Sequence, residues 1–135
     1  MTKLKPLHIF IIDDASSTRE TLQLVLLNIF RENYPQWLVK IHQAESFAEA
    51  RRHLLFQQAH ITFLDINLPD GNGLQFMSEL KESHPKMGVI IISGDATVEN
   101  VKAAMSYGAC SFILKPFKLI KVKDSIEHCF KKYNF

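Results

Sequence analysis

The sequence has little of what marks several common classes of small protein. Only two of its 135 residues are cysteines, Cys110 and Cys129, and they form no C-x-x-C motif. Zinc-ribbon and thioredoxin-like folds are therefore excluded, and buried free thiols of a protein kept in a reducing compartment are the default interpretation. The six histidines are scattered without an H-x-x-x-H pair, so they indicate no metal site.

The chain also lacks an excess of either charge and any long hydrophobic run. Sixteen Lys and Arg against 14 Asp and Glu give a net charge of +2, which gives no reason to expect nucleic acid or an anionic membrane as the main partner. The first apolar run, Leu7–Ile12, is too short for a signal peptide or a membrane span. We therefore expect a cytoplasmic protein of one globular domain, covering residues 1–135.

Short apolar runs alternate with segments of helical periodicity along the whole chain. The runs are rich in Ile, Val and Phe, which is typical of strands buried on both faces of a parallel sheet. The expected strands are Leu7–Ile12, Leu38–Ile41, His60–Leu64, Gly88–Ile92 and Ser111–Leu114. The expected helices are Thr18–Arg31, Ser46–Gln58, Leu74–Ser83, Thr97–Tyr107 and Leu119–Tyr133.

Residues that begin and end helices fall between these segments. Ser16 or Ser17 can cap the first helix, Ser46 and Glu49 match a capping box, and Gly108 suits a left-handed stop after the fourth helix. Five strands that alternate with five helices predict an α/β fold, a doubly wound five-stranded parallel sheet with right-handed crossovers.

Two local patterns add detail to this prediction. The segment Pro69–Gly73 is rich in turn-forming residues and predicts a tight turn after the third strand. In the fourth helix, the spacing of Val98, Val101, Ala104 and Met105 predicts one buried stripe.

Polar side chains follow the expected strands at their carboxyl ends, where doubly wound sheets place their chemistry. Asp13 and Asp14 follow the first strand, Asp65 the third, Ser93 the fourth and Lys115 the fifth. Taken singly, each has an ordinary structural interpretation: a helix cap, a turn residue, a loop hydroxyl or a solvated lysine. Taken together, three mutually repelling carboxylates at one edge need a common counter-charge.

A divalent cation supplies that counter-charge. Oxygen ligands without histidine or cysteine favour Mg²⁺, which keeps waters that a substrate can displace. With Lys115 as a second positive group, the edge suits a phosphoryl group. A carboxylate beside the metal can then act as the nucleophile and become an aspartyl phosphate.

These residues carry a resemblance to a known family. The pair Asp13-Asp14, the segment Asp65–Pro69, Ser93 and the segment Lys115–Phe117 stand in the order found in receiver domains of two-component response regulators. The chain resembles this family over nearly its whole length, and the resemblance implies the flavodoxin-like receiver fold.

The resemblance implies a role for each residue of the acidic group. Asp65 would be the phosphoacceptor. Asp14 and Asp65 would bind Mg²⁺ directly with the backbone carbonyl of Asn67, and Asp13 would act mostly through a bound water.

It also implies the groups that respond to phosphorylation. Ser93 would hydrogen-bond the phosphoryl group, Lys115 would pair with it, and Phe112 would rotate into the space that Ser93 leaves. The Lys115–Pro116 peptide bond would be cis. Phe112 stands where tyrosine is frequent, so this switch has no phenolic hydroxyl.

The function so implied is a phosphorylation-controlled switch rather than an enzyme proper. A histidine kinase or phosphotransfer protein would supply the phosphoryl group, and the fourth helix, fifth strand and fifth helix would contact a downstream target protein. We expect a single receiver domain without an output domain; dimerisation on activation is left open.

Two other interpretations are a small aspartyl-phosphate phosphohydrolase and a degenerate receiver that only binds partners. Adjacent rather than alternating aspartates disfavour the first, and the complete set of site residues disfavours the second.

Overall fold

A five-stranded parallel sheet forms the centre of the molecule. The computed structural model describes residues 3–135, and its strand order in this sheet is β2-β1-β3-β6-β7. The strands are β1 (Lys5–Ile12), β2 (Trp37–Ala44), β3 (Ile61–Asp65), β6 (Gly88–Ser93) and β7 (Ser111–Leu114). The helices are α1 (Ser16–Asn33), α2 (Phe47–Phe56), α3 (Gly73–Ser83), α4 (Val98–Ser106) and α5 (Leu119–Lys132).

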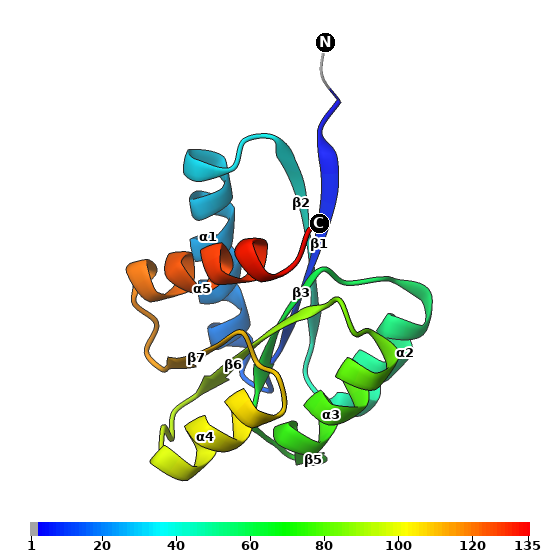
Figure 1. Ribbon diagram of the computed structural model, residues 1–135, viewed down its shortest axis with the longest axis vertical. Helices are drawn as coiled ribbons and strands as arrows, with labels where there is room; N and C mark the ends of the chain where they lie inside the picture. Colours follow the sequence, from blue (N-terminus) through cyan, green and yellow to red (C-terminus); the bar gives the residue numbers. More distant parts are fainter. Residues whose placement is uncertain (1–2) are drawn as a thin grey trace.

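The helices cover both faces of the sheet (Figure 1). Helices α1 and α5 pack on one face, over a core that includes Leu26, Phe63 and Ile126. Helices α2, α3 and α4 pack on the other, over a core that includes Phe10 and Phe76. Strands β3 and β6 are buried along their whole length, as expected of central strands covered on both sides. The predicted doubly wound α/β fold is confirmed.

The strands that the sequence defined least well are β1 and β2. Both are longer than predicted, and their register runs from Lys5 opposite Trp37 to Ile12 opposite Ala44. Strand β3 pairs with β1 only from Ile9 onward, so the first residues of β1 and β2 project beyond the rest of the sheet (Figure 1). This projecting part is half exposed, which weakens the apolar signal of its sequence.

One of the two predicted N-terminal helix caps differs from the structure. Ser46 caps α2 as predicted, because its hydroxyl accepts a hydrogen bond from the backbone N–H of Glu49 at 3.1 Å. The prediction for α1 was wrong: Ala15 is its N-cap residue and provides no side-chain cap. Asp13 lies before that cap and accepts a hydrogen bond from the N–H of Ala15 at 2.9 Å, so the chain enters α1 through an aspartate turn.

The predicted stripe of α4 was also partly wrong. Ala104 is buried, but Val98 and Met105 are 64% and 48% exposed. Helix α4 has only nine residues and lies near the edge strand β7, so it buries a narrow stripe and leaves apolar side chains in contact with solvent. At the end of α4, Gly108 adopts φ +100°, as its predicted role requires.

The predicted turn after β3 is built as a small hairpin. Strands β4 (Asn67–Leu68) and β5 (Gly71–Asn72) pair antiparallel around it. The carboxylate of Asp70 accepts hydrogen bonds from the N–H groups of Phe47 at 3.1 Å and Ala48 at 3.0 Å. These bonds hold the pKa of Asp70 below its usual range, and they fix the hairpin to the start of α2.

Three histidines form a row across β2, β1 and the start of β3. The Nδ1 atom of His8 and the Nε2 atom of His42 are 2.9 Å apart, and Nδ1 of His60 accepts a hydrogen bond from the N–H of His8 at 3.0 Å. Burial, followed by the positive charge of Lys40, lowers the pKa of His8. Burial also lowers the pKa of His42 and of His60, with additional contributions from the neighbouring histidines.

We predict that folding stability falls when the pH drops below about 6.5, the histidine value in the unfolded chain. A group whose pKa is lowered on folding stabilises the fold above its unfolded value and loses that contribution as the pH falls toward its folded value. When both rings are protonated, Nδ1 of His8 and Nε2 of His42, which are 2.9 Å apart, each carry a hydrogen, so neither can accept the hydrogen bond between them. Urea unfolding between about pH 7.5 and pH 5.5 measures the slope, and His42→Gln should make it shallower. An equal slope in both proteins would refute the assignment to this row.

Candidate functional site

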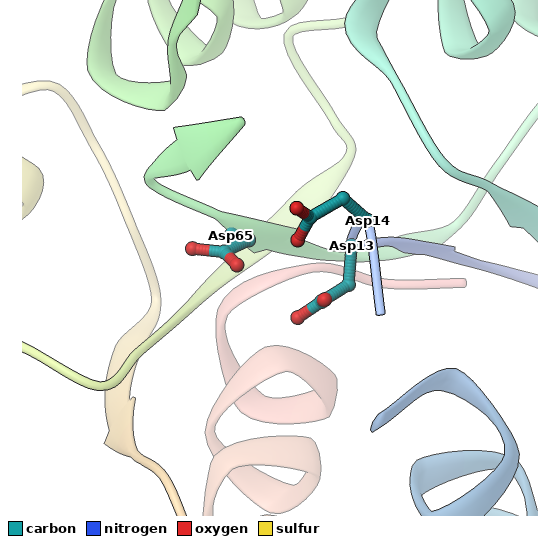
Figure 2. A group of neighbouring side chains, drawn as sticks. All are labelled: Asp13, Asp14 and Asp65. Atoms are coloured by element: carbon teal, nitrogen blue, oxygen red, sulfur yellow. The ribbon is translucent and has the colours of Figure 1, made fainter. Parts of the chain in front are cut away.

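Three carboxylates meet at the carboxyl ends of β1 and β3. Asp13 and Asp14 follow β1, and Asp65 is the last residue of β3. One carboxylate oxygen from each lies within 4.8 Å of the others, with Asp13 and Asp65 buried and Asp14 exposed. Figure 2 shows Asp13 and Asp14 extending from the end of β1 toward Asp65. Parallel pairing of β1 with β3 produces this arrangement, because it brings both strand ends to the same edge.

Lys115 reaches this acidic group from the end of β7. Its Nζ atom lies 2.5 Å from Oδ2 of Asp13 and 2.9 Å from Oδ2 of Asp65. The backbone positions the lysine, because its N–H donates to the carbonyl of Ser93 at 2.8 Å and continues the pairing of β7 with β6. The side chain is largely buried, with 23% of its surface exposed. One ammonium group thus joins two carboxylates that are 52 residues apart in the chain.

Burial and ion pairing act in opposite directions on these groups. Burial raises the pKa of Asp65, against the hydrogen bonds from Lys115 and from the N–H of Asn67 that lower it. Burial alone would lower the pKa of Lys115, but its hydrogen bonds to Asp13 and Asp65 outweigh burial and raise that pKa. The lysine therefore stays protonated at neutral pH, and the four groups together carry an excess of negative charge.

The excess charge fits a divalent cation. Three negative charges face one positive charge, and Asp14 forms no ion pair with residues 3–135. All the ligand atoms are hard carboxylate oxygens, which favour Mg²⁺ over zinc or copper. Asp13, Asp14 and Asp65 are the side chains that would hold it.

The other predicted residues, Ser93, Phe112 and Pro116, form no hydrogen bond with the three carboxylates within the described part of the chain. Ser93, fully buried at the end of β6, exchanges hydrogen bonds with the backbone of Asp95: its hydroxyl accepts from the N–H at 3.0 Å and donates to the carbonyl at 3.3 Å. Phe112 is half-buried on β7 and packs against the core under α4. The Lys115–Pro116 peptide bond is cis.

Two residues near the site were not identified from the sequence. Arg19 of α1 donates to the backbone carbonyl of Asp13 at 2.7 Å and so fixes the end of β1. Gly73, the first residue of α3, packs against the backbone of β3: a Cβ atom there would lie 2.6 Å from the carbonyl oxygen of Asp65 and 2.7 Å from Cα of Ile66. The Asn72-Gly73 pair signalled a turn, but only the tertiary contact shows why glycine is needed.

We predict that Gly73→Ala destabilises the fold by about 1–3 kcal/mol, because the added methyl group meets backbone atoms that cannot move aside. Gly94→Ala is the matched control, since its Cβ would have no neighbour within 4 Å, and it should change stability by no more than about 0.5 kcal/mol. Urea unfolding of both variants measures the difference. Equal stabilities would contradict the close approach at Asp65.

Comparisons with known proteins agree with this geometry. The profile of the response regulator receiver domain matches residues 9–127. The chain belongs to the response regulator receiver domain family. Among curated relatives, the sensory transduction protein LytT of Enterococcus faecalis is 29% identical over 126 residues, which are 93% of this chain and 49% of that protein.

Solved structures share the same fold. A two-component response regulator from Clostridium difficile superposes with a TM-score of 0.82 at 18% identity, covering 96% of this chain and 99% of that one. The receiver domain of NtrX from Brucella abortus gives a TM-score of 0.78 at 27% identity, covering 91% and 98%.

Membership in the family gives a general function. Receiver domains of two-component systems signal by phosphorylation, interact with a histidine kinase or another phosphodonor, and generally bind Mg²⁺ at an acidic pocket. The chain spans about half the length of LytT and 23% of the transcriptional regulator GlrR of Escherichia coli. Between residues 3 and 135, no helix is long and apolar enough to cross a membrane.

Proposed function

We propose that this receiver accepts a phosphoryl group on Asp65 from a histidine kinase or phosphotransfer protein, and that Mg²⁺ is required for the transfer. One observation carries the proposal. The ammonium group of Lys115 is held 2.9 Å from the Asp65 carboxylate, inside a group of three carboxylates at the carboxyl edge of the sheet. A nucleophile flanked by fixed positive charge, beside ligands for a hard cation, suits phosphoryl transfer.

Each residue of the site has its own role in the phosphoryl transfer. An oxygen of Asp65 attacks the phosphorus atom, the new P–O bond forms, and the bond to the donor breaks with its electron pair leaving on the donor. Lys115, already beside Asp65, pairs with the transferred group. Mg²⁺, held by Asp13, Asp14, Asp65 and the carbonyl of Asn67, would neutralise charge on the phosphoryl oxygens.

The signal would start at Ser93. Its hydroxyl is bonded to the backbone of Asp95, and a phosphoryl group on Asp65 offers stronger, charged acceptors. Turning toward them would release the β6–α4 connection and free space for Phe112, which is half-buried on the neighbouring strand β7. The result is a shift between two populations of the domain.

The output surface that we propose consists of α4, β7 and α5. This region exposes apolar side chains that the fold itself does not use: Val98, Met105, Leu114, Leu119 and Ile120. Exposed apolar groups of this kind suit contact with a target protein more than contact with nucleic acid.

Incubation with Mg²⁺ and acetyl phosphate tests the proposal. Intact-mass measurement should show one added phosphoryl group, and chelation of the metal should prevent it. A chain that takes up no phosphoryl group would be a degenerate receiver. Rapid turnover of phosphoester substrates without a stable adduct would instead identify a phosphohydrolase.

A further inference from the structure

The two cysteines of the chain lie together at the opposite end of the sheet from the carboxylates. Cys110 directly precedes β7, and Cys129 lies in the last turns of α5. Both are free and buried, at 4% and 0% exposure. They are the only two thiols in the sequence, and the fold brings them together although they stand on different elements.

Gly88, the first residue of β6, shows how near the two sulfur atoms are. A Cβ atom on this glycine would lie 2.8 Å from Sγ of Cys129 and 3.5 Å from Sγ of Cys110. The absence of a side chain at Gly88 therefore makes room for both thiols at one place.

The surroundings favour a thiolate on one of the two. Interaction with the neighbouring Cys129 thiol, helped by the charges of Lys132 and Lys81, outweighs burial and lowers the pKa of Cys110 to about 7. The same interaction, together with burial, raises the pKa of Cys129. Lys81 is fixed in place, since its Nζ donates to the carbonyl of Met87 at 2.9 Å and to the hydroxyl of Tyr133 at 2.6 Å.

We propose that Cys110 and Cys129 form a reversible intramolecular disulfide when the protein meets a peroxide, which makes this thiol pair a redox site separate from the phosphorylation site. A neighbouring second thiol and nearby ammonium groups favour such a bridge, and Cys110 is the less buried thiol, at 4% exposure against 0% for Cys129. The inference rests on the thiol pair itself and is independent of the function proposed above.

The reaction balances in two steps. The Cys110 thiolate attacks one oxygen of hydrogen peroxide, so that an S–O bond forms, the O–O bond breaks, and the departing hydroxide takes a proton to become water. The Cys129 sulfur then attacks the sulfenic sulfur, so that the S–S bond forms, the S–O bond breaks, and the departing hydroxide takes the Cys129 proton to become a second water. Two thiols are oxidised by two electrons in total, and one peroxide is reduced to two waters.

The bridge would join the start of β7 to α5. The chain segment it closes, Cys110–Cys129, contains Phe112, Lys115 and most of α5. A covalent link over a segment of this length restricts the unfolded chain, so the oxidised protein should melt higher, by on the order of 10 °C.

Peroxide treatment of the full chain, followed by denaturation and alkylation, tests the proposal. The wild-type protein should lose two hydrogens in mass, both thiols should resist alkylation, and a proteolytic peptide pair joined through Cys110 and Cys129 should appear. Dithiothreitol should reverse all three. Alkylation of both thiols after peroxide, bridges only between separate chains, or sulfinic acid at Cys110 beside a free Cys129 would each overturn the proposal.

Two variants separate the chemistry from stability. Cys110→Ser should keep Cys129 alkylatable after peroxide. Lys81→Met should move the pH midpoint of the oxidation rate upward and slow oxidation severalfold at neutral pH, and an unchanged pH profile would overturn the role of the charge. Asp65→Asn should oxidise at the wild-type rate, because the thiols lie at the other end of the sheet.

Discussion

Asp65→Asn should abolish phosphoryl uptake from acetyl phosphate, to below the limit of mass detection. The amide has nearly the same shape as the carboxylate but lacks the charged oxygen that attacks phosphorus. Burial already favours the uncharged form of Asp65, so the variant should fold. Intact-mass measurement after incubation with Mg²⁺ and acetyl phosphate gives the result.

The matched control for this loss is Asp70→Asn. Asp70 lies in the hairpin that follows Asp65, and its exposed carboxylate binds the start of α2 rather than the acidic group. The amide of this variant keeps one oxygen, which can accept one of the two hydrogen bonds, and the protein should take up one phosphoryl group like the wild type. Loss of uptake in both variants, or retention in both, would contradict the assignment of Asp65 as the acceptor.

We expect Asp14→Ala and Lys115→Ala to differ strongly in their effect on Mg²⁺ affinity. Asp14 is the exposed member of the carboxylate group and forms no ion pair with the described residues, so its removal should weaken Mg²⁺ binding by at least about 10- to 100-fold. Lys115 occupies oxygens of Asp13 and Asp65, so its removal frees ligand atoms and should leave Mg²⁺ affinity equal or higher. Calorimetric titration with Mg²⁺ measures both.

Lys115→Ala should nevertheless fail to respond to phosphorylation. Without the ammonium group, nothing pairs with the phosphoryl group from the side of β7, and the change at Ser93 and Phe112 should be blunted; amide NMR shifts in β7 and α4 would report it. Lys118→Ala, at the N-cap of α5, is the control and should respond normally. An affinity loss for Lys115→Ala as large as that for Asp14→Ala would contradict the assigned roles.

The architecture and the acidic group could be predicted because they depend on local patterns. Apolar runs such as Gly88–Ile92 fall within 1 residue of the observed strand β6, which ends at Ser93. Once the sheet is parallel, the residues after each strand share one edge, and the pairing of β1 with β3 then brings Asp13 near Asp65.

Other features depend on tertiary contacts that leave no local signal. The need for glycine at Gly73 arises from the approach of α3 to β3, and the exposure of Met105 from the position of α4 beside an edge strand. The direction of the Ser93 hydroxyl follows from a backbone bond to Asp95. The meeting of Cys110 with Cys129 requires the exact path of α5 across β6 and β7. The prediction that the protein is a single receiver without an output domain stays a prediction.

Borohydride trapping tests the central claim most directly. Reduction of the phosphorylated protein converts an aspartyl phosphate into homoserine, and peptide mapping by mass spectrometry then identifies the modified residue. We expect homoserine at position 65 and nowhere else, and only after incubation with both Mg²⁺ and the phosphodonor. Homoserine at position 13 or 14, or a phosphoryl group that borohydride does not remove, would contradict it.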